Sequence, residues 1–198
     1  MTLYDFLPSG NGYKVRLLLA QLEIPFVLVE KQIFKGETRT PEFLAINPNG
    51  RIPVLELDDG QRLAESDAIL FYLAEGTPFL PTDRLARARV LQWMFFEQYS
   101  HEPYIAVARR IRHMEEKPVP AELAQRGHQA LGVMERQLTG RRFFVDDVYT
   151  IADIALYAYT HVADEGGFDL AAYPAVRGWL ARVAAEPGHV LITQRDFP

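Results

Sequence analysis

The chain lacks cysteine altogether, and basic residues are in the minority. Without a thiol the protein can form no disulfide, no thiolate-metal site and no cysteine nucleophile. The chain has 21 Lys and Arg residues and 26 Asp and Glu residues, which gives a formal net charge of −5. A net negative chain is a poor match for a polyanion, so we predict no nucleic-acid partner.

Long hydrophobic runs and metal-binding patterns are also missing. No apolar run approaches the length of a membrane span. The apolar segment Leu17–Ala20 is short, and Asp5 precedes it where a secretory signal carries basic residues. The five histidines show no close pairing typical of a metal site. We therefore expect a soluble cytoplasmic protein with no membrane association and no metal.

A glycine-containing segment near the N-terminus resembles a nucleotide-binding turn only in part. In Gly10-Asn11-Gly12-Tyr13-Lys14-Val15, valine stands where a dinucleotide turn needs its third glycine. No Gly-Lys-Ser or Gly-Lys-Thr triplet of a phosphate-binding loop occurs anywhere in the chain. Both nucleotide-binding interpretations are therefore rejected.

The order of strand-like and helix-like segments divides the chain into two regions. Residues 1–76 alternate short strand-like and helix-like segments. The segment Phe26–Glu30 predicts a strand. Over residues 15–22 the apolar positions have the spacing of one helix face and predict a helix. Residues 77–82 contain two prolines and predict a linker, and residues 83–198 are helical in pattern. An α/β unit followed by helices predicts two domains that share a face.

Five helices are expected in the second domain. Their predicted ranges are 84–100, 104–116, 121–138, 150–162 and 174–185. Pro103 is expected to end the first of them, because proline interrupts a helix interior. Thr150 and Asp153 form a capping box with Asp in place of Glu, and we assign it a role in folding and not in catalysis.

The most informative motif is Ile52-Pro53-Val54, followed by Glu65 and Ser66. A proline at a strand start is tolerated, and in the cis form it turns an extended edge outward, where a peptide-like ligand can pair with the main chain. Ser66 is expected to cap a helix whose first amides bind a carboxylate, and Glu65 to bind an ammonium group. Taken singly, Pro53 fits an ordinary edge strand and Ser66 an ordinary cap; together they describe a site for an amino-acid zwitterion.

This arrangement resembles the thioredoxin-like glutathione-binding domain of the cytosolic glutathione transferases. The predicted strand Leu3–Leu7 and the following segment Pro8–Arg16 extend the match, and they are most similar to bacterial transferases related to the Nu class. The resemblance covers essentially the whole chain. It implies an α/β thioredoxin-like domain followed by an all-α domain, glutathione as co-substrate and a twofold homodimer.

The resemblance also implies roles for individual residues. Ser9 and Asn11 match the positions that hold the glutathione sulfur, where short donors and a helix N-terminus favour a thiolate. Alone, both residues also fit an ordinary turn. Tyr4 and Tyr13 are the rival donors, but one lies within the predicted strand and the other inside the predicted helix.

The remaining site residues are assigned either to glutathione or to the electrophile. The backbone of Ile52, together with Pro53, Glu65 and Ser66, is expected to bind glutathione. Three basic residues, Lys35, Arg39 and Arg51, are candidates for its glycyl carboxylate. An electrophile pocket is expected between the domains. We assign to it Phe96 and Tyr99 from the first predicted helix of the second domain and Arg109 from the next.

The sequence thus predicts a glutathione transferase that activates the thiolate for attack on small electrophiles or disulfides. One alternative is a non-catalytic transferase-like module for protein interaction or regulation. Another is a glutathione-dependent isomerase or dehalogenase on the same fold, although the Ser-Ser-Cys segment of the Zeta-type isomerase is absent.

Overall fold

The computed structural model describes residues 1–197, which form two compact units. The N-terminal unit comprises Met1–Glu75 together with the C-terminal segment that begins at Pro187. The helical unit comprises Gly76–Glu186. The first boundary lies close to the predicted end of the α/β domain at residue 76. The second domain was predicted to run on to residue 198, whereas its last segment packs with the N-terminal unit.

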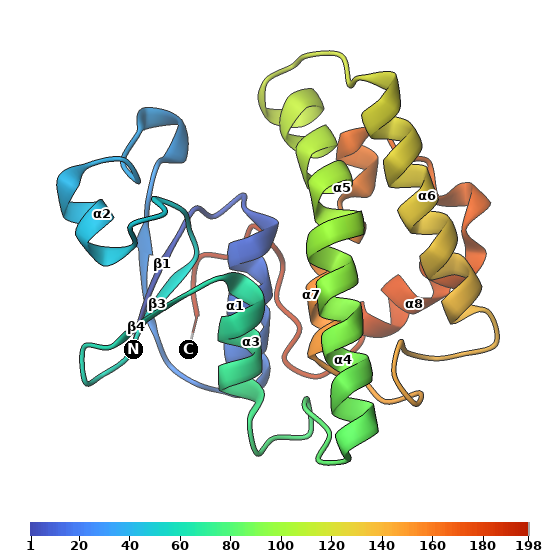
Figure 1. The fold of residues 1–198 in the computed structure, drawn as a ribbon, viewed down its shortest axis with the longest axis horizontal. Coiled ribbons are helices and arrows are strands. Elements are labelled where there is room, and N and C mark those ends of the chain that lie inside the picture. The colour runs from blue at the N-terminus through green and yellow to red at the C-terminus, as the bar shows by residue number, and fades with distance from the viewer. Residues whose placement is uncertain (198) are drawn as a thin grey trace. The chain divides into compact units, whose positions relative to one another are not determined.

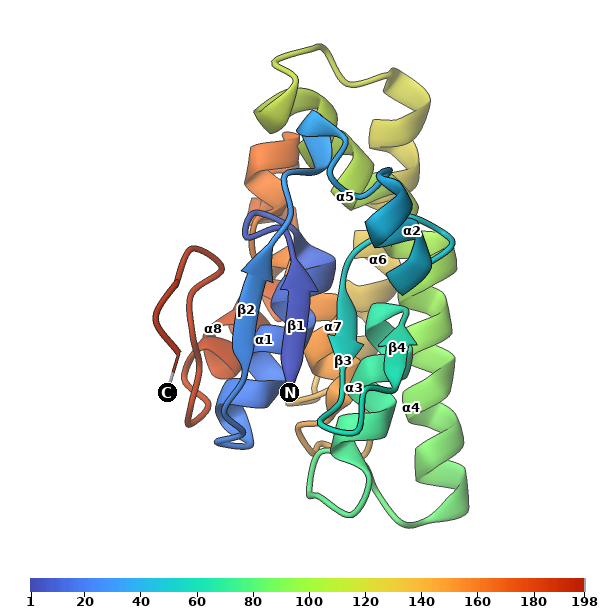
Figure 2. The same ribbon diagram turned by 90° about the vertical axis from the view of Figure 1, so that its left-hand side faces the viewer.

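A four-stranded mixed sheet, in the order β2-β1-β3-β4, forms the centre of the N-terminal unit (Figure 2). Strands β1 (Thr2–Asp5) and β2 (Val27–Glu30) are parallel. Strand β3 (Val54–Glu56) runs antiparallel to β1, and β4 (Arg62–Ala64) antiparallel to β3. This is the predicted thioredoxin-like sheet; β1 ends two residues before the predicted end at Leu7, and β2 begins one residue after the predicted start at Phe26.

Helices cover both faces of this sheet (Figure 1). Helices α1 (Gly10–Gln21) and α3 (Ser66–Ala74) lie together on one face, and α2 (Pro41–Ile46) lies on the other. Helix α2 has a favourable start, because the Thr40 hydroxyl accepts from the Phe43 amide and proline occupies the first turn. A short 3₁₀ turn, Ile33–Lys35, links β2 to α2.

The C-terminal segment belongs to the N-terminal unit because buried groups of α1 and a half-buried carboxylate of β2 hold it there. The Tyr13 hydroxyl donates to the Val190 carbonyl at 2.7 Å, and the Arg16 guanidinium donates to the Ile192 carbonyl at 2.9 Å. Arg195 adds an ion pair with Glu30 at 3.0 Å. Such partners lie more than a hundred residues apart, so no local pattern could reveal them.

The helical unit contains five α-helices: α4 (Arg84–Phe96), α5 (Glu102–Arg109), α6 (Ala121–Leu138), α7 (Ile151–Thr160) and α8 (Pro174–Ala184). It also contains two π-helical turns, Glu97–His101 and Arg110–Met114, and two 3₁₀ turns, Ala163–Gly166 and Leu170–Ala172. The predicted range of α6 matches the structure at both ends.

The prediction that Pro103 ends a helix is wrong in an informative way. Helix α4 passes through the π-helical turn Glu97–His101 directly into α5, and the two appear as one green ribbon in Figure 1. Pro103 stands in the first turn of α5. The wider π turn leaves room for a residue that has no N–H and a bulky ring, so the helix continues.

Helix α7 is the core of the helical unit, because every one of its residues is buried. Its predicted capping box is present between Thr150 and Asp153. The Asp153 carboxylate also accepts from the Phe144 amide at 3.2 Å and the Trp179 indole N–H at 2.9 Å. Burial raises the pKa of Asp153 to about 7, although all these donors act to lower it. The box therefore ties α7 to α8 and to the preceding loop.

Candidate functional site

The first turn of α1 presents the two predicted sulfur donors. Ser9 is the N-cap residue of α1, with extended backbone, and its hydroxyl oxygen accepts from the Gly12 amide at 3.4 Å. A hydroxyl that accepts through its oxygen keeps its proton for a second partner. Asn11 lies in the same turn, and both side chains are half-buried. The turn therefore offers a hydroxyl, an amide and the positive end of a helix.

A buried ion pair fixes this turn against the sheet. Asp5 at the end of β1 accepts from the Arg16 guanidinium at 2.9 Å, and neither side chain is exposed. Burial raises the pKa of Asp5 to about 6, against the opposing effect of Arg16. A Cβ atom at Gly12 would come within 1.6 Å of the Asp5 carboxylate, so only glycine lets α1 approach β1 this closely.

The Ile52–Pro53 peptide bond is cis, as predicted, and directly precedes β3. Pro53 is buried and Ile52 is half-buried. The loop before it is held by Arg39, whose guanidinium donates to the Asn49 carbonyl at 2.9 Å. Arg51 is exposed in the same loop. Two of the three basic candidates for the glycyl carboxylate are thus attached to the loop that leads into Ile52.

The third basic candidate, Lys35, lies elsewhere in the N-terminal unit. It ends the 3₁₀ turn and is exposed, with Gly36 at φ 76° after it. The structure gives no contact that joins Lys35 to the loop before Ile52.

Helix α3 begins one residue earlier than the sequence suggests. Ser66 is its first residue and is not the N-cap; Glu65 holds the N-cap position without a side-chain capping bond. Glu65 has a φ of 68°, in the left-handed region that non-glycine residues rarely adopt. Glu65 is exposed and Ser66 is buried. This backbone turn directs an acidic side chain to solvent while leaving the α3 amides at the site.

Sequence reasoning missed a buried lysine that joins α1 to the start of α3. Lys14 is fully buried, and its ammonium lies 3.3 Å from the Ser66 hydroxyl and 3.2 Å from an Asp67 carboxylate oxygen. The Ser66 hydroxyl in turn lies 3.5 Å from the Asn11 amide oxygen. The available signal was the presence of Lys14 and Arg16 in an otherwise apolar helix that contains no acidic residue.

The two tyrosines that rival Ser9 and Asn11 have other partners. The Tyr13 hydroxyl donates to the Val190 carbonyl at 2.7 Å and lies 3.3 Å from His189 Nε2. Tyr4 lies on β1, where its hydroxyl is 3.4 Å from a Glu56 carboxylate oxygen. Because a phenol has one proton, the Tyr13 proton is used in the link to the C-terminal segment.

In the helical unit, the three residues predicted for the electrophile pocket differ in environment. Phe96 is half-buried and packs edge-on against Trp93, with ring centroids 5.2 Å apart. Tyr99 is 83% exposed, whereas only 4% of Arg109 is exposed. The Arg109 guanidinium forms an ion pair with Glu165 at 2.5 Å. The Arg109 charge is therefore balanced by a neighbouring carboxylate.

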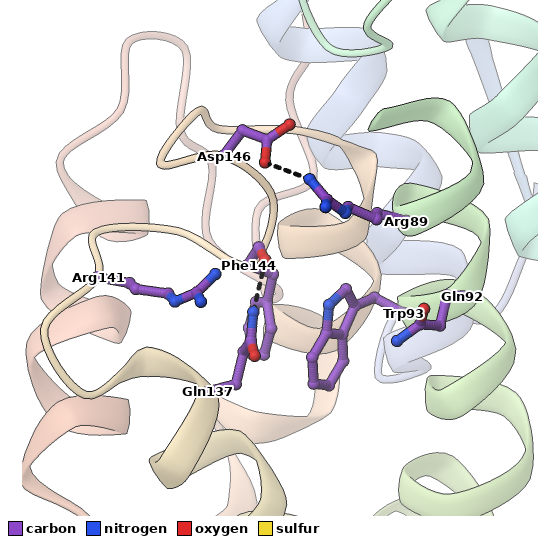
Figure 3. A pocket seen from close by; sticks show the side chains of 7 residues that line it. All are labelled: Arg89, Gln92, Trp93, Gln137, Arg141, Phe144 and Asp146. Atoms are coloured by element: carbon purple, nitrogen blue, oxygen red, sulfur yellow. Dashed lines mark hydrogen bonds and ion pairs between the residues drawn. The ribbon is translucent and has the colours of Figure 1, made fainter. Parts of the chain in front are cut away.

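A different cavity of about 410 Å³ lies on the helical unit (Figure 3). Arg89 and Trp93 on α4, Gln137 on α6 and Phe144 in the following loop point toward it. It is bounded on one side by the ion pair between Arg89 and Asp146, at 2.9 Å. None of the three predicted pocket residues lines it.

Two further searches concern metals and membranes. Within residues 1–197, no group of three or more His, Asp or Glu side chains is arranged to hold a metal ion. Over the same residues, no helix is both long and apolar enough to cross a bilayer.

Comparison with protein families decides the relationship. The glutathione S-transferase N-terminal domain matches residues 1–75, and the glutathione S-transferase C-terminal domain matches residues 93–187. This chain belongs to the glutathione S-transferase family. The matched ranges contain both ends of the site in the N-terminal unit, from Ser9 to Ser66.

Individual relatives agree with this membership. The disulfide-bond oxidoreductase YfcG of Escherichia coli is 32% identical over 192 residues, covering 92% of this chain and 89% of the relative. Protein URE2 of Candida albicans is 29% identical, covering 94% of this chain and 67% of the relative.

Solved structures are similar over nearly the whole chain. The crystal structure of a glutathione S-transferase from Pseudomonas fluorescens is 52% identical, has a TM-score of 0.95 and covers 98% of both chains. A glutathione transferase homologue from Lodderomyces elongisporus, with two GSH per subunit, is 26% identical, has a TM-score of 0.85 and covers 94% of both. None of these comparisons distinguishes a Nu-class subtype.

Proposed function

We propose that this member of the family is a glutathione-dependent enzyme that binds glutathione on its N-terminal unit and ionises the thiol. The observation that carries the proposal is the meeting of two predicted groups. Ser66, assigned to the glutamyl end, and Asn11, assigned to the sulfur, have side chains 3.5 Å apart although they are 55 residues apart in sequence. A pocket that serves one small peptide must bring such groups together.

The binding mode follows from the chemistry of each group. The main chain of Ile52, directly before Pro53 and β3, pairs with the cysteinyl part of glutathione. The α-carboxylate of the γ-glutamyl residue accepts hydrogen bonds from the Ser66 hydroxyl and the first amides of α3. The α-ammonium of the same residue pairs with the Glu65 carboxylate. Arg39 and Arg51 flank the glycyl carboxylate from the preceding loop, and Lys35 is a weaker candidate from the 3₁₀ turn.

The chemistry lies in the thiol, because the protein contributes no nucleophile of its own. Ser9 and Asn11 donate to the sulfur, and the N-terminus of α1 adds a favourable potential. A thiol with an unperturbed pKa of ~8.5 is then largely ionised at neutral pH. The thiolate attacks an electrophilic carbon, forming a carbon–sulfur bond as the leaving group departs with its electron pair. The protein supplies positioning and electrostatic stabilisation.

Disulfide reduction is a second reaction that the same site supports. A glutathione thiolate attacks the disulfide and releases one thiolate; a second glutathione then attacks the mixed disulfide, giving glutathione disulfide and the second thiol. No protein cysteine takes part in these steps. The relation to a disulfide-bond oxidoreductase and to a homologue with two GSH per subunit favours this candidate.

The electrophile side of the site is less defined than the glutathione side. Phe96 and Tyr99 supply exposed aromatic surface suited to an apolar second substrate. Arg109, which is paired with Glu165, is the third proposed residue of this pocket. The non-catalytic alternative draws support from the similarity to the nitrogen regulation fragment of the yeast prion protein Ure2p, which is 28% identical. It predicts glutathione binding without turnover of any substrate, and the isomerase or dehalogenase alternative predicts turnover without a conjugate.

The test combines binding and turnover. Glutathione affinity is measured by isothermal titration in the parent, Glu65→Ala and Ser66→Ala, with the exposed Glu122→Ala as control. Each lost charge-assisted bond should weaken binding by about 1 kcal/mol or more, roughly fivefold, and the control should leave it unchanged. Unchanged affinity in both site variants refutes the binding mode. A screen of electrophiles and small disulfides then separates conjugation, reduction and the absence of turnover.

A further inference from the structure

The cavity between α4, α6 and the loop after α6 has no ligand assigned to it so far (Figure 3). Its volume of about 410 Å³ lies within the range of small-molecule sites, roughly 300–1,000 Å³. All of its lining residues belong to the helical unit, and none of them is assigned to glutathione or to the electrophile. The cavity is therefore a candidate for a separate binding site.

The charges around the cavity favour an anion. Arg89 and Arg141 contribute two positive charges, and Asp146 contributes the one carboxylate among the seven described residues that line it. This local excess of positive charge contrasts with the net charge of −5 of the whole chain. The side-chain amides of Gln92 and Gln137 add neutral hydrogen-bonding groups.

Arg141 carries the guanidinium best suited to bind such an anion. Figure 3 shows its side chain extending from the loop toward the other lining residues. Arg89 already uses one of its nitrogens in the ion pair with Asp146, at 2.9 Å. Within the described residues 1–197, the Arg141 guanidinium forms no ion pair or hydrogen bond. Its planar fork of N–H donors matches both oxygens of one carboxylate.

Hydrogen bonds from two helices hold the loop that carries Arg141. From α8, the Arg182 guanidinium donates to the carbonyls of Arg141 and Arg142, at 3.3 and 3.0 Å. From α6, the Gln137 amide donates to the Phe144 carbonyl at 2.9 Å. A fixed backbone reduces the conformational entropy that is lost when a ligand binds. The cavity is thus organised before any ligand arrives.

We propose that this cavity binds a small organic anion through a carboxylate group, which the Arg141 guanidinium holds in a bidentate contact. Arg89, although paired with Asp146, adds a second positive charge, and the amides of Gln92 and Gln137 hydrogen-bond the rest of the ligand. An organic carboxylate fits better than inorganic phosphate, because the volume exceeds that of one small oxyanion and the two amides need partners. This site goes beyond the proposed function, since it uses none of the residues assigned to glutathione.

Tryptophan fluorescence can follow binding at this cavity. Trp93 lines it, and Trp179, the other tryptophan of the chain, packs edge-on against the lining residue Phe144, with ring centroids 5.2 Å apart. The probes are succinate and citrate, with succinamide as an uncharged match of succinate and inorganic phosphate as a second control. We expect a saturable change with a carboxylate probe and at least tenfold weaker binding of both controls. No saturable response to either probe, or an equal response to phosphate, overturns the inference.

Charge substitutions of opposite sign separate binding from a general loss of structure. Arg141→Gln should weaken succinate binding about tenfold, because it removes the bidentate contact. Arg142→Gln makes the same change of charge at an exposed neighbour outside the lining and should leave the affinity within about twofold. Asp146→Asn removes the competing carboxylate and should strengthen binding severalfold. Asparagine tolerates the left-handed backbone of this position, where φ is 49°. Equal weakening in both arginine variants, or weaker binding in Asp146→Asn, overturns the inference.

A competition experiment distinguishes this cavity from the proposed glutathione site, which also takes carboxylates. The succinate titration is repeated at saturating glutathione and in Ser66→Ala. The affinity for succinate should be unchanged in both cases, because Ser66 does not line the cavity. Competition by glutathione, or loss of succinate binding in Ser66→Ala, would assign the probe to the N-terminal unit and overturn the inference.

Discussion

At the scale of single residues, the account depends on two short donors in the first turn of α1. If Ser9 and Asn11 share the sulfur, neither Ser9→Ala nor Asn11→Ala should abolish turnover. Each should lower the rate and raise the apparent thiol pKa by about one to two units, because one donor to a charged group contributes roughly 1.5–3 kcal/mol. The double variant should be worse than either. The pH profile of turnover measures this, and a profile unchanged in both single variants contradicts the assignment.

Tyr13 provides the matching negative case. Its hydroxyl donates to the Val190 carbonyl, so Tyr13→Phe should leave the thiol pKa in place. The loss of one buried hydrogen bond should lower the free energy of unfolding by about 1 kcal/mol, measured by urea denaturation. A raised thiol pKa in Tyr13→Phe, without a rise in the Ser9 and Asn11 variants, would replace this account with a tyrosine mechanism.

Some site residues were predictable because their signal is local. Ser9 precedes a helix, Pro53 opens a strand, and Glu65 and Ser66 precede an apolar run, and each of these signals is confined to its own short segment. Lys14 was not found, because its meaning depends on Asp67, which is 53 residues away and meets it only when α1 and α3 pack together. The left-handed turn at Glu65 likewise moved Ser66 from the cap into the helix.

At the scale of elements, the contact between α1 and β1 positions the first turn of α1. Gly12→Ala would place a methyl group within 1.6 Å of the Asp5 carboxylate, forcing it away from Arg16. Disrupting a buried ion pair is costly, so we expect a loss of about 3 kcal/mol or more in the free energy of unfolding. Gly132→Ala in α6 is the control: its nearest neighbour is the flexible end of Arg136 at 3.6 Å. It should be neutral or stabilise by up to about 1 kcal/mol. Equal effects of the two substitutions contradict this packing.

The elements themselves were largely predictable from apolar spacing and caps. The range of α6 and the capping box before α7 needed only local information. The continuous passage from α4 into α5 did not follow from the sequence, because a π turn compensates for Pro103. The packing of the last segment with the N-terminal unit could not be predicted for a similar reason. Its partners, Tyr13 and Arg16, are distant from it in the sequence.

At the scale of the whole molecule, we propose a twofold homodimer that uses exposed aromatic surface on two helices. Phe95 on α4 is 68% exposed, and Tyr72 on α3 is 51% exposed. Aromatic side chains are enriched in protein interfaces. The double variant Tyr72→Glu, Phe95→Glu should convert a dimer to a monomer by light scattering at micromolar concentration, whereas Val148→Glu, at an exposed loop position, should not. A monomeric parent under these conditions refutes the proposal.

The most direct test of the central claim is the thiolate absorbance of glutathione bound to the parent protein, recorded against pH. The account predicts that the bound thiol titrates at least one unit below the ~8.5 of a free thiol, because two donors and a helix N-terminus stabilise the anion. The same titration with S-methylglutathione, which has no ionisable thiol, should show no such transition. A bound thiol that titrates at or above the value of the free thiol would contradict the account.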